Sequence, residues 1–237
     1  MKQENYIRGM IMIILSAFFF ACMNVSVRLA GDLSSVQKSF FRNLVAAFFA
    51  AIILIKNHTA PKVEKTQWGS LFLRCAFGTL GILCNFYAID HLLVADASIL
   101  NKLSPFFAII FSFLLLKEKI KPAQAMCVIL AFVGCLFVVK PGFENAHLIP
   151  ALIGVCGGLG AGIAYTMVRK MGTHGVKGPV IVFYFSCFSC IIVIPWIVFH
   201  YQPMSLRQLL TLLLAGLFAA GGQFTITAAY TYAPAGK

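Results

Sequence analysis

A lysine lies within an apolar run that is long enough to cross a lipid bilayer. Lys102 falls near the middle of the run from Leu93 to Leu116, beside Asn101 and one turn after Ser98. At 100° per residue these polar side chains fall on one side of a helix. A charged side chain at the bilayer centre costs about 3 kcal/mol or more unless it faces protein or water. This face is therefore predicted to line a polar cavity, where the ammonium group would bind a substrate carboxylate or phosphate or exchange a proton. Internal pairing and snorkelling to the head groups are the alternatives.

Polar side chains in other apolar runs could share the same cavity. Asn24 lies near the end of the first run, and Arg42 lies just inside the second, where its cation would attract an anion. Asn85 lies in the third run, and Gln223 lies on one side of the eighth. The predicted substrate-binding residues are Lys102, Asn101, Ser98, Asn85, Asn24, Arg42, Tyr165, Tyr184 and Gln223.

The composition identifies the elements that must position these residues. Hydrophobic residues make up 60% of the chain and charged residues only 11%, which is far from the balance of a soluble domain. Apolar runs of about 20 residues recur along the whole length and predict transmembrane helices. The net charge of +12 does not indicate nucleic acid, because the lysines and arginines lie mostly between the runs. The fold class is therefore an all-α polytopic membrane protein.

Eight spans are expected, followed by the start of a ninth from Tyr232 to Lys237. Basic residues between the spans lie mainly on the side of the N-terminus, which predicts that this end is cytoplasmic. The location that fits best is a bacterial plasma membrane. The predicted spans cover residues 7–29, 39–55, 69–90, 93–116, 123–139, 148–168, 180–199 and 206–230.

The chain contains a weak internal repeat at a shift of about 140 residues. Val27-Arg28 matches Val168-Arg169, Asn24 aligns with Tyr165, and Arg42 aligns with Tyr184. The first unit, residues 7–140, holds five spans, and the second unit covers residues 148–237. Because five is an odd number, the second copy must start on the opposite side of the membrane. Such inverted repeats are typical of secondary transporters, with the substrate site near the midplane.

The chain also resembles a known family along nearly its whole length. The resemblance is to the EamA domain of the drug/metabolite transporter superfamily, and the fourth-span pattern L-S-P-F-F-A is its most specific part. The matching segments are N-V-S-V-R-L (Asn24 to Leu29), F-F-R-N (Phe40 to Asn43), N-F-Y-A (Asn85 to Ala88), L-S-P-F-F-A (Leu103 to Ala108) and L-K-E-K-I (Leu116 to Ile120).

The resemblance implies a ten-helix carrier of small metabolites, and such a carrier would work by alternating access. The charge of Lys102 favours an anionic or zwitterionic substrate such as an amino acid or organic acid. This sequence departs from that plan, because only eight spans and the start of a ninth are expected. The second copy of the Leu103-Ser104-Pro105 pattern would lie beyond Lys237. A truncated, non-transporting membrane protein is therefore an alternative.

Some residues with chemical potential are expected to be structural. Arg28 and Arg169 lie near span ends, where head-group anchoring is the commoner role. Glycines recur at four-residue steps in the sixth span, and Gly78 and Gly81 share a stripe with Arg74 and Asn85 in the third. Small residues at such spacing predict close helix packing in lipid.

A membrane enzyme acting on lipid is a further alternative. Asp90, His91 and Asp96 cluster at one helix boundary, but no nucleophile is positioned beside them. The histidines are too scattered for a metal site. We therefore expect no catalytic residue, metal or cofactor. The expected partners are a small-molecule substrate and the bilayer, without nucleic acid, and a homodimer is left open.

Overall fold

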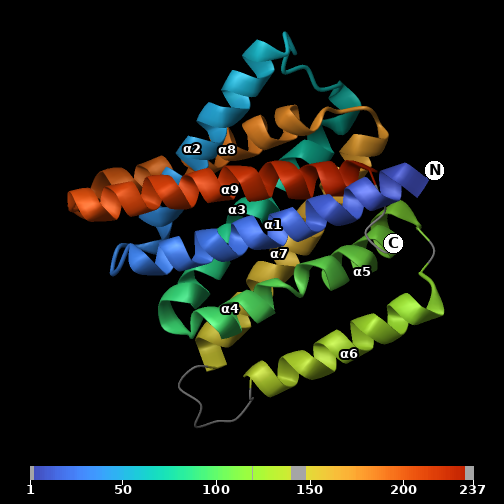
Figure 1. Ribbon diagram of the computed structural model, residues 1–237, viewed down its shortest axis with the longest axis horizontal. Coiled ribbons are helices and arrows are strands. Elements are labelled where there is room, and N and C mark those ends of the chain that lie inside the picture. Colours follow the sequence, from blue (N-terminus) through green and yellow to red (C-terminus); the bar gives the residue numbers. More distant parts are fainter. Residues whose placement is uncertain (1–2, 119, 140–147, 233–237) are drawn as a thin grey trace.

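Every element that the structure describes is a helix. The computed structural model describes residues 3–118, 120–139 and 148–232, and the residues that would begin a ninth span lie almost wholly outside these ranges. The helices are α1 (Gln3–Leu29), α2 (Ser35–Lys56), the short 3-10 helix η1 (Lys65–Gln67), α3 (Trp68–His91), α4 (Val94–Asn101), α5 (Ser104–Leu116), α6 (Pro122–Val139), α7 (Leu148–Thr173), α8 (Gly178–His200) and α9 (Leu206–Tyr232) (Figure 1).

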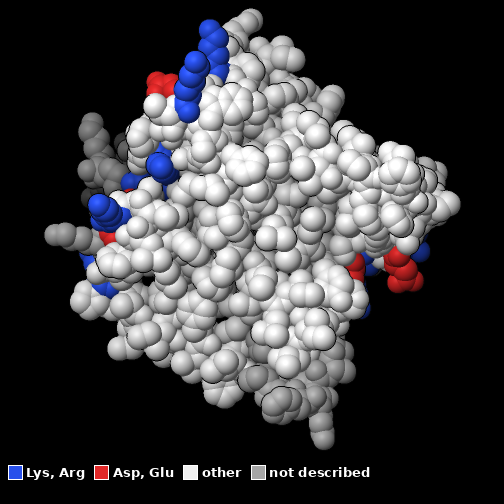
Figure 2. Space-filling model, turned by 180° about the vertical axis from the view of Figure 1, so that it is seen from behind, with Lys and Arg blue, Asp and Glu red and all other residues white. Residues whose placement is uncertain are grey.

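The predicted all-α membrane fold is confirmed. Over the described ranges, seven segments are long and apolar enough to cross a membrane, with α4 and α5 counted as one, and α6 is a shorter apolar helix. Figure 2 shows charged side chains gathered at opposite sides of one face, with a broad uncharged band between them. An uncharged band between two charged rims fits a protein that is surrounded by lipid at its middle.

The second helix begins earlier than predicted. Its first turn is polar, yet Gln37, Lys38 and Ser39 are fully buried. The Ser34 hydroxyl accepts a hydrogen bond from the backbone N–H of Gln37 and caps the helix. The Gln37 side chain donates a hydrogen bond to the carbonyl oxygen of Gln202 and accepts one from its backbone N–H. The Gln202 side chain accepts a hydrogen bond from the backbone N–H of Ser34. Hydropathy missed this turn because tertiary contacts, and not apolar character, bury it.

The helices pack as pairs that are far apart in the sequence. The most extensive contacts join α1 to α9, α3 to α7, and α2 to α8. By contrast, α6 lies at the edge of the bundle, where its main contacts among the described helices are with α4, α5 and α7 (Figure 1). The centre of the bundle is therefore enclosed by α1, α2, α3, α7, α8 and α9.

Glycines let α3 and α7 pack closely, and close packing is what their spacing in the sequence predicted, without indicating which helices would pair. A Cβ atom added to Gly160 would lie 2.8 Å from the carbonyl oxygen of Phe77, and one added to Gly81 would lie 3.1 Å from the backbone nitrogen of Ala161. Gly157 approaches the backbone of Asn85 just as closely. Backbone-to-backbone packing at this distance leaves no room for larger side chains.

The predicted fourth span is broken in the structure. α4 ends at Asn101 and α5 begins at Ser104, so Lys102 and Leu103 form a turn between them. Pro105 explains the break, because proline has no N–H to donate to the carbonyl of Asn101 and its ring crowds that group. The prediction of one regular helix over this run was therefore wrong at its centre.

Candidate functional site

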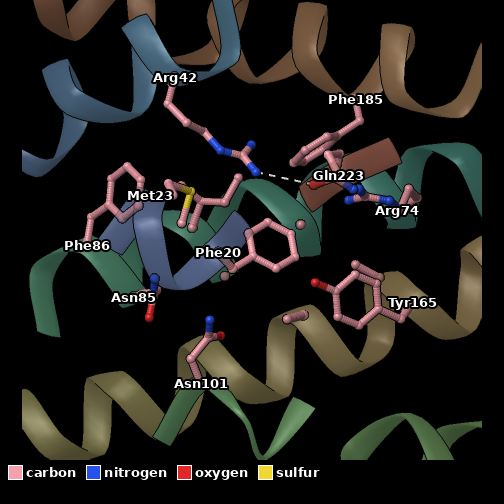
Figure 3. A pocket seen from close by; sticks show the side chains of 15 residues that line it. Phe20, Met23, Arg42, Arg74, Asn85, Phe86, Asn101, Tyr165, Phe185 and Gln223 are labelled. Atoms are coloured by element: carbon pink, nitrogen blue, oxygen red, sulfur yellow. Dashed lines mark hydrogen bonds between the residues drawn. The ribbon is translucent and has the colours of Figure 1, made fainter. Parts of the chain in front are cut away.

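A small cavity with both polar and apolar side chains in its lining lies at the centre of the bundle. Side chains from α1, α2, α3, α4, α7, α8 and α9 converge on it, and its volume is about 50 Å³ (Figure 3). Ordinary ligand pockets begin at about 300 Å³. The polar side chains that line the cavity are Arg42, Arg74, Asn85, Asn101, Tyr165 and Gln223.

Arg42 reaches the cavity from α2 and is only 2% exposed. Its Nη1 donates a hydrogen bond of 2.6 Å to Asn43 Oδ1, and its Nη2 donates one of 3.2 Å to Gln223 Oε1. Its Nε has no hydrogen-bond partner. Both acceptors are neutral amides, so they orient the guanidinium group without neutralising its charge.

Arg74 enters the same cavity from α3 and is equally buried. Its guanidinium carbon stands 3.8 Å above the ring centre of Phe185, while that of Arg42 lies 5.8 Å from the same ring. Stacking on an aromatic face is favourable for arginine. Its Nε is unpartnered, and no described residue accepts a hydrogen bond from it or forms an ion pair with it.

Gly78 makes room for this second arginine. A Cβ atom at Gly78 would collide with Arg74 Nη1 and would lie 2.8 Å from the ring of Phe185. The glycine sits one turn after Arg74 on the same helix face, so the guanidinium group can fold back over it. Here the glycine shapes the site, whereas Gly81 and Gly160 serve the packing of helices.

Amide and hydroxyl groups complete the lining. Asn85 Oδ1 and Gln223 Nε2 are buried without a hydrogen-bond partner. Tyr165 stacks on Tyr230 with ring centres 5.0 Å apart, and Figure 3 shows its hydroxyl directed toward the cavity. Buried polar groups without partners are uncommon in native proteins, and a bound ligand or ion is one explanation for them.

Two of the other predicted residues lie beside the cavity. Asn24 Nδ2 donates a hydrogen bond of 3.1 Å to Ser98 Oγ, which joins α1 to α4. Asn24 is buried, and its Oδ1 has no partner. Their hydrogen bond connects the two helices close to Asn101, but neither residue is part of the cavity lining.

Lys102 and Tyr184 lie away from the cavity. Lys102 is exposed at the turn between α4 and α5, although the sequence placed it on the cavity face. Asn101 points inward (Figure 3), whereas Lys102 lies in the turn where the helix is interrupted, so the regular helical face predicted from the sequence does not extend to it. The Tyr184 hydroxyl donates a hydrogen bond of 2.8 Å to the carbonyl of Pro61. The expected position of the lysine was therefore wrong, and the buried cations of the site are the two arginines.

Arg74 was not among the residues predicted to bind substrate. The sequence placed it on one stripe with Gly78, Gly81 and Asn85, and that stripe faces the cavity. The sequence pattern that could have identified Arg74 as a site residue was a cation on the same helix face as small residues and an amide. Hydropathy alone gives no reason to prefer it over Lys102, which lies deeper within its span.

Two further arginines join helices at the ends of the bundle. Arg28 Nη1 donates to the carbonyl oxygens of Ile89 and Asp90, at 2.7 and 2.8 Å, where α3 ends. Arg169 Nη1 donates to the carbonyl oxygen of Thr231, at 3.5 Å, where α9 ends, and its Nε pairs with Glu118 at 3.4 Å. These groups were expected to anchor in lipid head groups. The structure shows them bound to the C-terminal ends of neighbouring helices, where cations are favoured.

The acidic cluster at the end of α3 has structural partners. The carboxylate of Asp90 pairs with the fully buried Lys38 at 2.5 Å and accepts a hydrogen bond from Ser35. The ring nitrogen Nδ1 of His91 bonds to the carbonyl oxygen of Tyr87. Among the described residues, no group of three or more histidine, cysteine or acidic side chains could hold a metal ion.

Comparisons with known proteins agree with this architecture. The chain is 32% identical over 229 residues to the pseudopaline exporter CntI of Pseudomonas aeruginosa, covering 94% of this chain and 78% of that protein. It is 27% identical to human solute carrier family 35 member G1, covering 96% and 66% of the two chains, and 25% identical to the riboflavin transporter of Brucella anthropi, covering 91% and 78%. A crystal structure with 14% identity has the same fold at a TM-score of 0.71, covering 98% of this chain and 80% of the other.

A family model provides the assignment. Residues 7–140, more than half of the chain, match the EamA-like transporter family. The relatives named above are transporters, and the described helices are apolar enough to span a membrane. This chain belongs to the EamA-like transporter family and is a polytopic membrane transporter.

Proposed function

We propose that this protein is a secondary carrier that moves a small metabolite, such as an organic acid or amino acid, through the central cavity by alternating access. The observation that carries the proposal is the cavity itself, whose buried polar side chains come from both halves of the chain. Arg42 and Asn85 come from the first half, and Tyr165 and Gln223 from the second. A site between two halves can open to either side when the halves rock against each other.

The proposal includes two inverted five-helix units. It is supported by the two arginines at the bundle ends, since Arg28 and Arg169 are matched positions in the repeat. Each donates to a carbonyl at the end of the third helix of its own unit, Asp90 or Thr231. Figure 1 shows α1 and α7 running in opposite directions through the bundle.

The helix pairs support the same symmetry. If α1, α2 and α3 correspond to α7, α8 and α9, then the contact of α1 with α9 is the counterpart of the contact of α3 with α7. The contact of α2 with α8 is its own counterpart. These are the three most extensive helix contacts of the described chain. A two-fold axis in the membrane plane would pass between α2 and α8.

The cavity is too small in this conformation for a metabolite. A volume of about 50 Å³ holds only a few water molecules. We therefore propose that the helices around the cavity must move apart before a metabolite can bind there. The N-terminus is proposed to be cytoplasmic, in the plasma membrane of a bacterium.

Transport by the purified protein in lipid vesicles tests this function. Vesicles preloaded with riboflavin, single amino acids or dicarboxylates would be assayed for exchange with the same labelled solute. We expect at least one solute to exchange faster than in protein-free vesicles, and Arg42→Ala to reduce that rate at least about tenfold, because it removes a charge-assisted contact. Arg207→Ala, at an exposed position at the start of α9, is the matched control. Equal exchange in the Arg42→Ala variant and the wild type would contradict a carrier that uses this cavity.

A further inference from the structure

We infer that the substrate is a metabolite with two acidic groups, and that these groups bind Arg42 and Arg74 together. This inference rests on the proposed carrier function and narrows its substrate class. Three observations support it: both arginines are charged, both lie against the ring of Phe185, and the side chains around them are neutral.

The two guanidinium groups are buried without a compensating charge. Each arginine is 2% exposed, and each has an Nε atom without a hydrogen-bond partner. The described side chains that line the cavity include no aspartate or glutamate. The ion pairs of Lys38 with Asp90 and of Arg169 with Glu118 both lie outside the cavity. Burying an uncompensated charge is strongly unfavourable, so an anion would be stabilised here.

The geometry directs both charges at one small region. The guanidinium carbons of Arg74 and Arg42 lie 3.8 and 5.8 Å from the ring centre of Phe185. Two like charges against one ring repel each other in a medium of low dielectric constant. One negative group would relieve only part of that repulsion, whereas two acidic groups would match both cations. Guanidinium groups also present paired N–H donors that suit carboxylate and phosphate oxygens.

Neutral groups beside the arginines would add to recognition of an anion. Gln223 Oε1 accepts a bond from Arg42, which leaves its Nε2 unpartnered and free to donate to a substrate oxygen. Asn85 also has an unmade bond at the cavity. A zwitterion such as a simple amino acid fits less well, because its ammonium group would meet two cations and no carboxylate among the described lining residues. The site thus selects by net charge.

A ligand series of constant size and varying charge tests the inference. The full chain, purified in detergent, would be titrated with succinate, succinamate and succinamide at constant ionic strength, and thermal unfolding would report binding. We expect affinity to fall at least about tenfold at each loss of a carboxylate. Inorganic phosphate distinguishes a preference for phosphate from one for carboxylate.

Substitutions of the two arginines test which side chains distinguish ligands by their charge. Arg74→Gln and Arg42→Gln are each expected to remove the preference for succinate over succinamate, while Arg74→Lys retains part of it. Arg207→Gln, at the exposed start of α9, is the control, and we expect it to retain the wild-type order of affinities for succinate, succinamate and succinamide. The lysine variant shows whether the loss in Arg74→Gln comes from lost charge or from a damaged fold.

The outcomes separate this inference from the proposed function. Equal binding of succinate and succinamide, an unchanged series in Arg74→Gln, or no binding of any anion would overturn the two-acid site, while transport of a neutral or zwitterionic solute would leave the carrier standing. Charge-dependent binding without transport in vesicles would refute the carrier and keep the anion site.

Discussion

At the scale of single residues, the site depends on where a side chain is absent as much as on where one is present. Arg74 can fold back over Gly78 because that residue has no Cβ atom, and the ring of Phe185 closes the space from the other side. A Cβ atom at position 78 would meet both the guanidinium group of Arg74 and the ring of Phe185, so at least one of these side chains would have to move. The position of the cation is therefore set by the glycine.

Gly78→Ala should consequently impair the site. The added methyl group would collide with Arg74 Nη1 and the ring of Phe185, so we expect the affinity for succinate to fall at least about tenfold. Gly69→Ala in the same helix is the matched control, since a Cβ atom there would meet no atom within 4 Å. Titration of both variants with succinate is the measurement. Equal affinities would show that Arg74 tolerates displacement and that Gly78 does not position it.

At the scale of the elements, close contact of α3 with α7 holds the two halves of the chain together. A Cβ atom on Gly160 would lie 2.8 Å from the carbonyl oxygen of Phe77, and a backbone group cannot move aside as a side chain can. We expect Gly160→Ala to destabilise the protein by about 1–3 kcal/mol, the usual cost of overpacking. Gly134→Ala in the peripheral helix α6 has free space around it and should be neutral or slightly stabilising. Thermal unfolding of both variants decides the matter, and a stable Gly160→Ala protein would mean that the helices can separate at no cost.

The elements were largely predictable from the sequence, whereas the side chains of the site were only partly so. Apolar runs of bilayer length gave the spans, because lipid demands such runs regardless of tertiary structure. The structure places the predicted residues Arg42, Asn85, Asn101, Tyr165 and Gln223 around the cavity. The sequence analysis placed Lys102 at the cavity and did not include Arg74 among the substrate-binding residues. The position of Lys102 depends on how the fourth span turns at Pro105, and that of Arg74 depends on which face of α3 packs toward α8. Those are properties of helix packing, which no single run of sequence contains.

At the scale of the whole molecule, the two arginines at the bundle ends have matched roles. Arg28 joins α1 to the end of α3, and Arg169 joins α7 to the end of α9 and to Glu118. If the two units are inverted copies, these contacts lie on opposite sides of the membrane. Each would then hold one side of the cavity closed, and loss of one would shift the population toward the state open on that side.

Arg28→Gln and Arg169→Gln should therefore have opposite effects on access to the cavity. An Asn101→Cys substitution would report access to the cavity through the reaction of its thiol with a membrane-impermeant reagent. The same protein with Asn101 intact measures the labelling of the native cysteines, which is subtracted as background. We expect Arg28→Gln to raise the labelling rate from the side opposite the N-terminus, and Arg169→Gln to raise it from the side of the N-terminus. Each substitution removes one charged hydrogen-bonding group of about 1.5–3 kcal/mol, enough to change the population ratio at least about tenfold. Faster labelling from the same side in both variants would mean that the two contacts share one membrane face, and an inverted repeat could not then explain their matched positions.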